Sequence, residues 1–358
     1  MVRIVFVIPS FSGGGAERVM LTLIKHIDRK HVEPILIVMN DQGPLRSLIP
    51  SDITVYDLKT VRLRNGIYKL INKIRNLEPS VIISTFTHIN VTLLALKPLI
   101  SKPTKLIIRE ANTPSRSLKS THSPNFFRFM CRHYYPKADV VLCSSALIEN
   151  EMKEKFKVPT SKIFRLNNPI DIDNIRSFAP VPVNHKDFAK YFVAAGRLTH
   201  QKGFDRLLVD FAKTPRDFCL IILGEGPELK NLTKQIKSLD LQKRVFLEGF
   251  KENPWSIISG ADAFLLPSRW EGMSNVSLEA LACGVSVIAT PEAGGIREIL
   301  KFVPQGSLTI APSGEHFVKA LVKTKTTHIH ENRPSLLPND WDVVNVTKKF
   351  ENIILNTI

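Results

Sequence analysis

Short apolar runs alternate with helical patterns along the first half of the chain. The runs, each predicted to form a buried strand, span residues 3–9, 32–40, 53–58, 80–86, 105–110 and 138–145. Helices are predicted over 16–26 and over 65–77, where apolar residues recur at the spacing of one helix face. Apolar strands separated by helices favour a parallel sheet covered by helices on both of its faces.

The same alternation restarts after a polar segment, residues 168–189, which contains three prolines and is predicted to be a linker. Further strands are predicted over 191–196, 218–224, 244–249, 263–267 and 285–290, with helices over 203–213, 226–239, 254–260 and 275–283. We therefore expect a first domain over 1–167, a second over 190–340, and a terminal amphipathic helix, 341–358, that crosses back to the first. The fold class is α/β with two doubly wound domains, whose ligands bind at the carboxyl ends of the strands in the cleft between them.

Composition narrows the class of protein. The chain has 358 residues, 44% of them hydrophobic, and its mean hydropathy is 0.00, which is ordinary for a globular domain. The apolar runs are far shorter than the roughly 20 residues that a spanning helix needs, and the first residues do not have the pattern of a signal peptide. The four cysteines, Cys131, Cys143, Cys219 and Cys283, are widely scattered, which favours a reduced, cytoplasmic compartment and argues against a zinc site.

The charge is unevenly distributed. The chain carries 49 basic and 33 acidic side chains, a net of +16. Residues 1–190 hold 29 basic and 15 acidic ones, a net of +14, whereas residues 191–358 hold 20 and 18. This asymmetry is expected if the first half meets a polyanion, either nucleic acid or an acidic membrane surface.

A run of glycines, Gly13 to Gly15, follows the first predicted strand and opens the first predicted helix. Glycines at such a turn let backbone N–H groups approach an anion at the helix N-terminus. The run matches neither G-x-G-x-x-G nor the G-K-[ST] of a P-loop, so a phosphate loop and a plain turn both stay open.

Two cations, Arg197 and Lys202, lie five residues apart after the first strand of the second half, between Gly196 and Gly203. An Arg fork and a Lys point charge at a strand end can clamp a diphosphate. The alternative is a basic surface loop.

Two glutamates, Glu271 and Glu279, lie eight residues apart, the first in a predicted loop and the second inside a predicted helix. Ser274 or Asn275 is expected to cap that helix, with its positive end toward the cleft. Carboxylates there suit a hydroxyl-rich ligand. The alternative, solvated glutamates on a helix, is weakened because the residues around Glu279 are apolar.

Together these motifs resemble the family 4 retaining glycosyltransferases. The segments that carry the resemblance are 13–18, 168–171, 196–208, 222–232, 247–255 and 268–300, and the glutamate pair matches that family's E-x7-E motif. The resemblance implies the GT-B fold, with two Rossmann-like domains facing across a cleft, and a nucleotide-sugar donor. It also implies transfer with retention of anomeric configuration and without a metal or other cofactor.

The resemblance also implies roles for individual residues. Arg197 and Lys202 hold the diphosphate and stabilise the leaving nucleotide, Glu271 binds the hydroxyls of the donor sugar, and Glu279 binds the ribose. Backbone N–H groups near the phosphates or sugar come from Met273, Ser274, Asn275 and Val276. The remaining donor contacts are Phe250 and Lys251 beside the base, Gly196, Gly224 and Gly226 along the donor cleft, and Gly14 and Gly15 from the first domain.

The acceptor side departs from the family pattern. Many members place a histidine after the fifth strand of the first domain, whereas this chain has Arg109 and then Asn112. Arg109 is expected to replace that histidine, as in members that build lipopolysaccharide, capsule or lipid-linked oligosaccharides, and His88 is a further candidate for an acceptor contact. The implied reaction moves a hexose or N-acetylhexosamine, from a UDP-sugar, to a glycan or a polyprenyl-linked glycan.

An anionic membrane surface is the expected partner of the basic half. Its cations flank apolar and aromatic residues, a composition typical of interfacial helices. These residues are Arg62, Arg64, Lys69, Lys73 and Arg75, then Arg116, Lys119, Phe126, Phe127, Arg128, Phe129, Arg132, Tyr134 and Tyr135. The alternative is a core stripe with a solvated basic face. The expected location is the inner face of the cell membrane, peripherally bound from the cytoplasm.

Other functions explain less of the sequence. Nucleic-acid binding would account for the charge and the aromatics, but not for the paired glutamates, so no nucleic-acid partner is expected. A dinucleotide-dependent oxidoreductase lacks the full glycine fingerprint. A GT-B nucleotide-sugar epimerase stays open.

Overall fold

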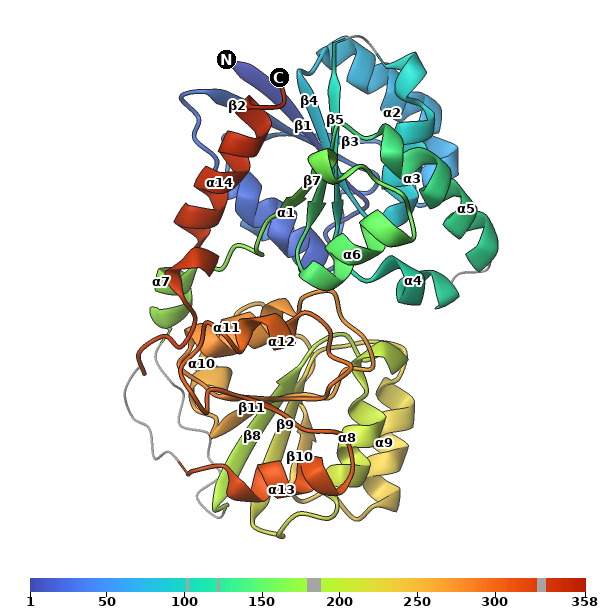
Figure 1. Cartoon of the computed structure of the whole chain (residues 1–358). Helices are drawn as coiled ribbons and strands as arrows, with labels where there is room; N and C mark the ends of the chain where they lie inside the picture. The colour runs from blue at the N-terminus through green and yellow to red at the C-terminus, as the bar shows by residue number, and fades with distance from the viewer. Residues whose placement is uncertain (101–102, 121–122, 179–187, 327–332) are drawn as a thin grey trace. The chain divides into compact units, whose positions relative to one another are not determined.

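The computed structural model describes residues 1–100, 103–120, 123–178, 188–326 and 333–358 (Figure 1). The chain forms two compact units: unit 1 holds Met1–Pro169 and Asp340–Ile358, and unit 2 holds Ile170–Asn339. Part of the segment predicted as a linker is folded, because helix α7 (Ile172–Arg176) buries Ile172 and Ile175 and contacts helix α11 (Asn275–Ala282) of unit 2. The rest of that segment, 179–187, lies outside the described residues.

Unit 1 is built on a seven-stranded parallel sheet in the order β3-β2-β1-β4-β5-β6-β7. The strands are β1 (Val2–Ile8), β2 (Val32–Val38), β3 (Thr54–Asp57), β4 (Val81–Thr85), β5 (Lys105–Glu110), β6 (Val140–Cys143) and β7 (Ile163–Arg165). Each apolar run of the first half forms one of the first six. The apolar pattern missed β7, a three-residue edge strand that is only partly buried.

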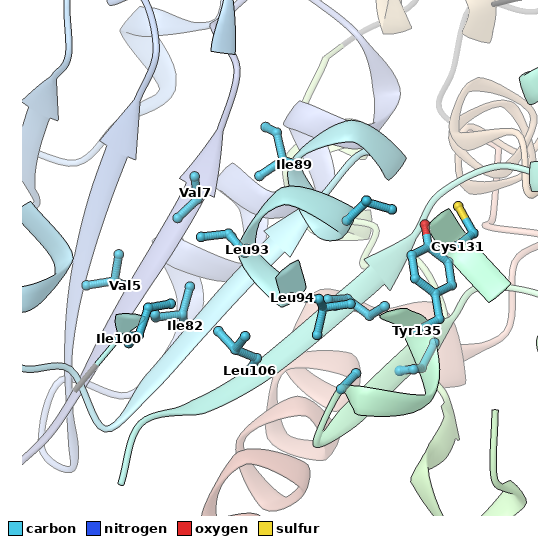
Figure 2. Packing of buried hydrophobic residues seen from close by; sticks show 14 of the residues in the cluster. Val5, Val7, Ile82, Ile89, Leu93, Leu94, Ile100, Leu106, Cys131 and Tyr135 are labelled. Carbon is cyan, nitrogen blue, oxygen red and sulfur yellow. The ribbon is translucent and has the colours of Figure 1, made fainter. Parts of the chain in front are cut away.

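Helices cover both faces of this sheet because alternate strand residues point to opposite sides. One face packs against α2 (Leu63–Leu77), α3 (Thr87–Ala95), α5 (Pro124–Tyr134) and α6 (Ala146–Glu154). Figure 2 shows part of this layer, with Val5, Val7, Ile82 and Leu106 of the strands beside Leu93 and Leu94 of α3. The other face packs against α1 (Gly15–His26) and α14 (Val343–Leu355), where the ring of Phe350 lies 6.3 Å from that of Phe6.

Unit 2 repeats this architecture with a six-stranded parallel sheet in the order β10-β9-β8-β11-β12-β13. The strands are β8 (Lys190–Ala195), β9 (Phe218–Leu223), β10 (Val245–Leu247), β11 (Ala263–Leu266), β12 (Val287–Ala289) and β13 (Leu308–Ile310). The helices are α7, α8 (Phe204–Phe211), α9 (Leu229–Ser238), α10 (Trp255–Ser259), α11 (Asn275–Ala282), α12 (Ile296–Ile299) and α13 (Glu315–Lys323).

Both sheets are doubly wound, which confirms the predicted fold class. The strand order reverses between β1 and β4 in unit 1 and between β8 and β11 in unit 2. Ligands of such sheets bind beyond the carboxyl ends of the strands at the reversal. In unit 2 those ends carry the loops that hold most of the predicted site residues. Across the described parts of both units, no helix combines the length and apolar character that a membrane span requires.

Candidate functional site

Two loops of unit 2 pack backbone against backbone at the carboxyl ends of β8 and β9. Gly196 and Gly224 have φ of +150° and +131°, conformations that favour glycine. A Cβ on Gly224 would lie 2.1 Å from the carbonyl oxygen of Gly196, and one on Gly226 would lie 2.4 Å from that of Leu198. Any side chain at these positions would push the loops apart, so the three predicted glycines shape the segment that carries Arg197 and Lys202.

Lys202 and Glu271 form an ion pair within this edge of the sheet. Lys202 ends the 3₁₀ turn η6 (His200–Lys202) after β8, and its Nζ lies 2.6 Å from Oε1 of Glu271, which follows β11. The two side chains are only 17% and 8% exposed. The hydroxyl of Ser268 donates to the same carboxylate oxygen at 2.8 Å. Two of the predicted catalytic residues, Lys202 and Glu271, therefore lie side by side, and in this structure they are bonded to each other.

Arg197 differs from Lys202 in its surroundings. Its side chain is exposed, and among the residues that the structure describes it has no hydrogen-bond or ion-pair partner. A guanidinium without a competing carboxylate keeps all of its donors available to an anion. The same short loop thus carries one cation without an ion-pair partner among the described residues, Arg197, and one cation that is paired, Lys202.

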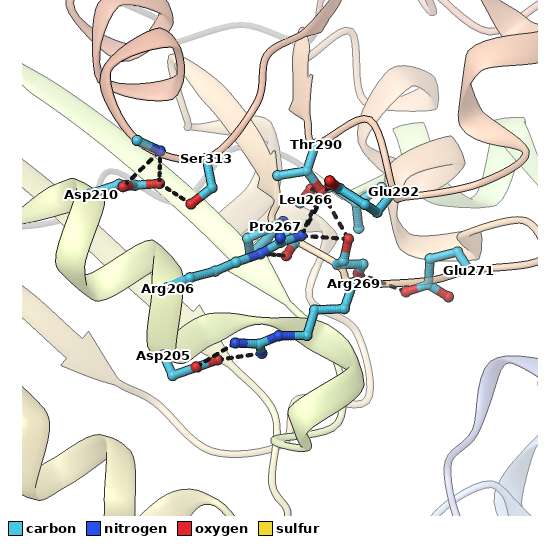
Figure 3. A network of polar contacts seen from close by, with 12 residues as sticks. Asp205, Arg206, Asp210, Leu266, Pro267, Arg269, Glu271, Thr290, Glu292 and Ser313 are labelled. Carbon is cyan, nitrogen blue, oxygen red and sulfur yellow. Dashed lines mark hydrogen bonds and ion pairs between the residues drawn. The ribbon is translucent and has the colours of Figure 1, made fainter. Parts of the chain in front are cut away.

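A network of polar contacts that the sequence did not reveal fixes the start of α8 and the turn before it to the loop after β11 (Figure 3). Arg269 binds Asp205 through two hydrogen bonds of 2.7 and 2.6 Å and donates a third, of 2.8 Å, to the carbonyl of His200. Arg206 donates to the carbonyls of Pro267 and Ser268, each at 2.7 Å. The hydrogen bond from Arg269 lowers the pKa of Asp205, so this carboxylate stays ionised at neutral pH.

Helix α11 begins at this edge of the sheet. Ser274 occupies its N-cap position as predicted, but its hydroxyl is buried and has no hydrogen-bond partner in the described structure. Met273 is buried, whereas Asn275 and Val276 are half-buried. The first N–H groups of a helix have no partner within it, so the start of α11 offers donors to an anion or a hydroxyl.

Glu279 lies one turn into α11 and is only 7% exposed. Its Oε2 accepts a 3.0 Å hydrogen bond from the indole N–H of Trp255 in α10. Because both glutamates of the pair are buried, the alternative of solvated glutamates on a helix is wrong. Burial with specific hydrogen-bond donors is the usual setting of functional carboxylates.

The loop after β10 adds Phe250 and Lys251, both half-buried. Lys251 makes a loose ion pair, 3.6 Å long, with Glu248. The backbone N–H of Gly224 donates to the carbonyl of Gly249 at 2.7 Å, which ties this loop to the one after β9. The donor residues predicted in unit 2 thus all lie on loops or a helix start at one edge of its sheet, although their roles stay predictions.

In unit 1, Gly14 is the N-cap of α1 and Gly15 is its first residue. The first turn also holds Glu17, which is buried and accepts a 3.0 Å hydrogen bond from the hydroxyl of Ser12. A carboxylate near a helix N-terminus interacts favourably with the helix dipole, so an incoming phosphate meets a negative charge there. The predicted contact of Gly14 and Gly15 with the donor stays a prediction.

Arg109 is 2% exposed on β5, and its Nη2 donates to Oδ1 of Asn168 at 2.6 Å. Its Nη1 is buried without a hydrogen-bond partner in the described structure, and burial lowers the pKa of the guanidinium to about 10. Asn112 is half-buried and accepts from the backbone N–H of Thr113 at 2.9 Å, while His88 is exposed on α3. Arg109 therefore holds the start of segment 168–171, a contact that the sequence did not predict.

Glu110, next to Arg109, belongs to a buried network that the sequence analysis also missed. Its carboxylate accepts hydrogen bonds from the hydroxyl of Tyr135 and, at 3.1 Å, from the amide of Asn90. Burial raises the pKa of Glu110 to about 7. The network corrects one expectation: Tyr135 was predicted among the interfacial aromatics, but it is fully buried in unit 1 because Glu110 satisfies its hydroxyl there.

Two D-x-D triplets, at 171–173 and 340–342, have a spacing at which carboxylates can share a metal ion. In each triplet one aspartate caps a helix instead. Asp171 accepts from the N–H of Asn174 at the start of α7, and Asp342 accepts from that of Val344 at the start of α14. The expectation of metal-free transfer stays a prediction.

Comparison with known proteins relates both units to sugar-transferring enzymes. Residues 13–174 match the family model described as Glycosyltransferase Family 4, and residues 176–334 match that described as Glycosyl transferases group 1. A Campylobacter jejuni protein is 32% identical over 81% of this chain and 81% of its own length. It is named N-acetylgalactosamine-N,N'-diacetylbacillosaminyl-diphospho-undecaprenol 4-alpha-N-acetylgalactosaminyltransferase.

Two further proteins are similar. The lipopolysaccharide 1,6-galactosyltransferase of Salmonella typhimurium is 26% identical over 62% of each chain. The crystal structure of Anabaena HepE in complex with UDP-glucose superposes with a TM-score of 0.81, covering 99% of this chain and 100% of its own at 20% identity. That structural likeness confirms a GT-B type of fold.

Proposed function

Because the chain belongs to the family 4 glycosyltransferases, we propose that it transfers a hexose or N-acetylhexosamine from a UDP-sugar to a lipid-linked glycan during surface polysaccharide assembly. The enzyme class, a glycosyltransferase, follows from the family. The donor, the acceptor and retention of anomeric configuration are our proposal. Their support comes from the residues of unit 2 and from what the similar enzymes are named for.

The observation that carries the proposal is the Lys202–Glu271 ion pair beside the exposed Arg197 and the start of α11. Glycosyl transfer builds negative charge on the diphosphate as the bond to the sugar breaks. Positive groups placed in advance at that point stabilise such charge most effectively. Arg197 and Lys202 provide two cations on one loop, and the α11 N-terminus provides backbone donors.

In this proposal the carboxylates of Glu271 and Glu279 bind different hydroxyl groups of the donor. Glu279, held by Trp255, presents its other oxygen to the ribose hydroxyls. Glu271 presents its second oxygen to hydroxyls of the transferred sugar while its first holds Lys202 in place. A carboxylate that both positions a cation and accepts a hydroxyl fixes the sugar relative to the diphosphate.

The proposed acceptor and membrane partner rest on the names of similar enzymes and on the charge of unit 1. The Campylobacter relative is named for a diphospho-undecaprenol substrate and the Salmonella relative for lipopolysaccharide. Unit 1 carries most of the basic excess, so it is proposed to bind an anionic membrane from the cytoplasmic side. His88, Arg109 and Asn112 are proposed on the acceptor side, with Arg109 acting by holding Asn168.

Donor hydrolysis tests the function without knowledge of the acceptor. Purified protein is incubated with a panel of UDP- and GDP-sugars, and the released nucleotide and sugar are measured by mass spectrometry. We expect one UDP-sugar to be turned over, with Arg197→Ala slower by about 10²–10³-fold. Turnover of none, or equal turnover by wild type and Arg197→Ala, would overturn the proposal.

The membrane partner has a separate test. Co-sedimentation with anionic and neutral vesicles is measured over a series of salt concentrations. Each basic residue near an anionic surface contributes about 1 kcal/mol within a Debye length of about 8 Å, so binding is expected to need anionic lipid and to fall with salt. The variant Arg62→Glu/Arg64→Glu/Lys69→Glu/Lys73→Glu is expected to bind less. Binding that ignores both lipid charge and these substitutions would contradict the membrane proposal.

A further inference from the structure

An open pocket of about 760 Å³ lies within unit 1, on the side of the sheet covered by α5 and α6. The residues that line it belong to α4 (Pro114–Ser117), the turn η3 (Leu118–Ser120), α5 and the end of α6. Helix α4 contacts η3 and α6, and η3 contacts α5; the three helices are labelled in Figure 1. The volume falls within the range of about 300–1,000 Å³ typical of small-molecule sites. None of the donor or acceptor residues predicted above lines it.

The lining is strongly basic. Five cationic side chains face the pocket, and one acidic residue, Glu154, does so. The cations are Arg116, Lys119, Arg128, Arg132 and Lys155. Within the described part of the chain, Lys119, Arg128 and Arg132 have no ion-pair partner. Three cations without ion-pair partners raise the local positive potential of a concave site, and an anion relieves their mutual repulsion.

Part of this basic wall is fixed before any ligand arrives. The buried carboxylate of Glu151 accepts from Nζ of Lys155 at 2.8 Å and from the backbone N–H of Ser115 at 3.0 Å. Nζ of Lys155 also lies 3.2 Å from the hydroxyl of Ser115. These contacts join the end of α6 to α4. Arg128 and Arg132, one turn apart on α5, present two guanidinium forks from the same helix face.

Apolar rings accompany these cations. Phe156 is buried at the base of the pocket, and Phe129 on its wall is 65% exposed. An exposed ring of this size beside a cluster of cations suits a ligand with an anionic head and a hydrocarbon part. A flat membrane surface does not require a concave site, so the shape of the pocket favours a discrete ligand.

The pocket is also close along the chain to the acceptor side. Arg116 follows the last residue of β5, Glu110, by six residues, so their Cα atoms lie within about 20 Å of each other. A short glycan spans such a distance. An acceptor can therefore have its diphosphate in the pocket and its sugar at the carboxyl edge of the sheet.

We propose that this pocket binds the diphosphate of a lipid-linked acceptor, with Arg116, Lys119, Arg128 and Arg132 contacting the phosphates and Phe129 contacting the first part of the hydrocarbon chain. The proposal rests on the proposed function, because it assigns a site to the acceptor named there. It differs from general membrane binding in requiring one ligand in one concave site.

The test is a binding measurement that needs no transfer. The full chain is first saturated with UDP, so that the donor site is occupied, and is then titrated by calorimetry with farnesyl diphosphate, a short soluble prenyl diphosphate. We expect saturable binding, weaker binding of inorganic pyrophosphate, and at least about tenfold weaker binding of farnesyl diphosphate by Arg128→Ala/Arg132→Ala. Both arginines are exposed, so this variant is expected to keep its fold and its affinity for UDP.

A matched control removes the same charge elsewhere in unit 1. Lys348 and Lys349 are exposed on α14, and Lys348→Ala/Lys349→Ala is expected to change farnesyl diphosphate binding less than twofold. Equal weakening by both variants would overturn the proposal in favour of general charge attraction. So would binding of anionic vesicles that depends on Arg128 and Arg132 while farnesyl diphosphate does not bind. If the wild type hydrolyses no donor, the proposed function is contradicted instead. Failure of the pocket proposal can therefore be distinguished from failure of the proposed function.

Discussion

Removal of the Lys202 side chain should lower both the rate and the stability of unit 2, for two separable reasons. Lys202 lies 2.6 Å from Glu271, and the carboxylate is only 8% exposed. Lys202→Ala leaves that carboxylate buried and without its cation, although the Ser268 hydroxyl still donates to it. Loss of one partner from a buried pair typically costs about 3–5 kcal/mol. The residual exposure of Lys202 and the Ser268 hydroxyl place our expectation at the lower end, about 3 kcal/mol.

The rate effect has a different origin. Lys202 is proposed to stabilise the leaving diphosphate, and loss of one such preorganised donor costs about 10²–10³-fold in turnover. The double variant Lys202→Ala/Glu271→Gln removes the unpaired charge but does not restore the cation. We expect it to recover most of the lost stability, to within about 1 kcal/mol of wild type, and to stay as slow as Lys202→Ala.

Urea unfolding of wild type, both single variants and the double variant gives the four stabilities, and donor hydrolysis gives the four rates. The reasoning is refuted if the double variant is no more stable than Lys202→Ala, because the ion pair then contributes nothing to stability. It is refuted equally if Lys202→Ala turns over the donor like wild type.

Three further predictions follow from other contacts. Arg197→Ala should lose about 10²–10³-fold in turnover with an unchanged melting temperature, because its exposed side chain has no described partner; a clear drop in melting temperature would show a structural role. Glu279→Gln should raise the calorimetric Kd for UDP while Glu271→Gln mainly weakens binding of the intact donor, and equal effects on both ligands would contradict this division. Burial raises the pKa of Glu110 from its usual 4.5 to about 7. Protonation of Glu110 therefore stabilises the folded unit 1, and this contribution is complete below about pH 4.5 and is lost as the pH rises through 7. Urea unfolding at pH 5 and pH 8 should show that loss in wild type and not in Glu110→Gln; identical pH dependence in both would refute the assignment.

The sequence predicted the fold well because apolar runs and helical spacing report burial directly. Every strand expected in either half is present. The two strands that were missed, β7 and β13, have only three residues each, and each strand includes exposed and half-buried residues. Helix α3 was missed because its polar residues, Thr87, His88, Asn90 and Thr92, are spread around the helix and leave no one-sided apolar pattern.

The site was predictable only as far as its residues lie in local motifs. The loop of Arg197 and Lys202 and the pair Glu271 and Glu279 are short patterns with known chemistry. The Lys202–Glu271 bond joins residues 69 apart in the chain, and Arg269 binds Asp205 over 64 residues. Such contacts depend on how neighbouring loops meet, which no spacing rule encodes. Tyr135 was misplaced for the same reason, because composition does not reveal its hydrogen bond to Glu110.

The central claim is that the loops after β8 and β11 and the start of α11 hold the nucleotide sugar. Amide hydrogen exchange followed by mass spectrometry, with and without saturating UDP-sugar, tests it most directly, because backbone N–H groups that a ligand contacts become protected. We predict protection concentrated in residues 196–203 and 271–279 of unit 2, and much weaker protection of 196–203 in Arg197→Ala. Protection confined to other segments, with these two unchanged by a donor that binds, would contradict the account.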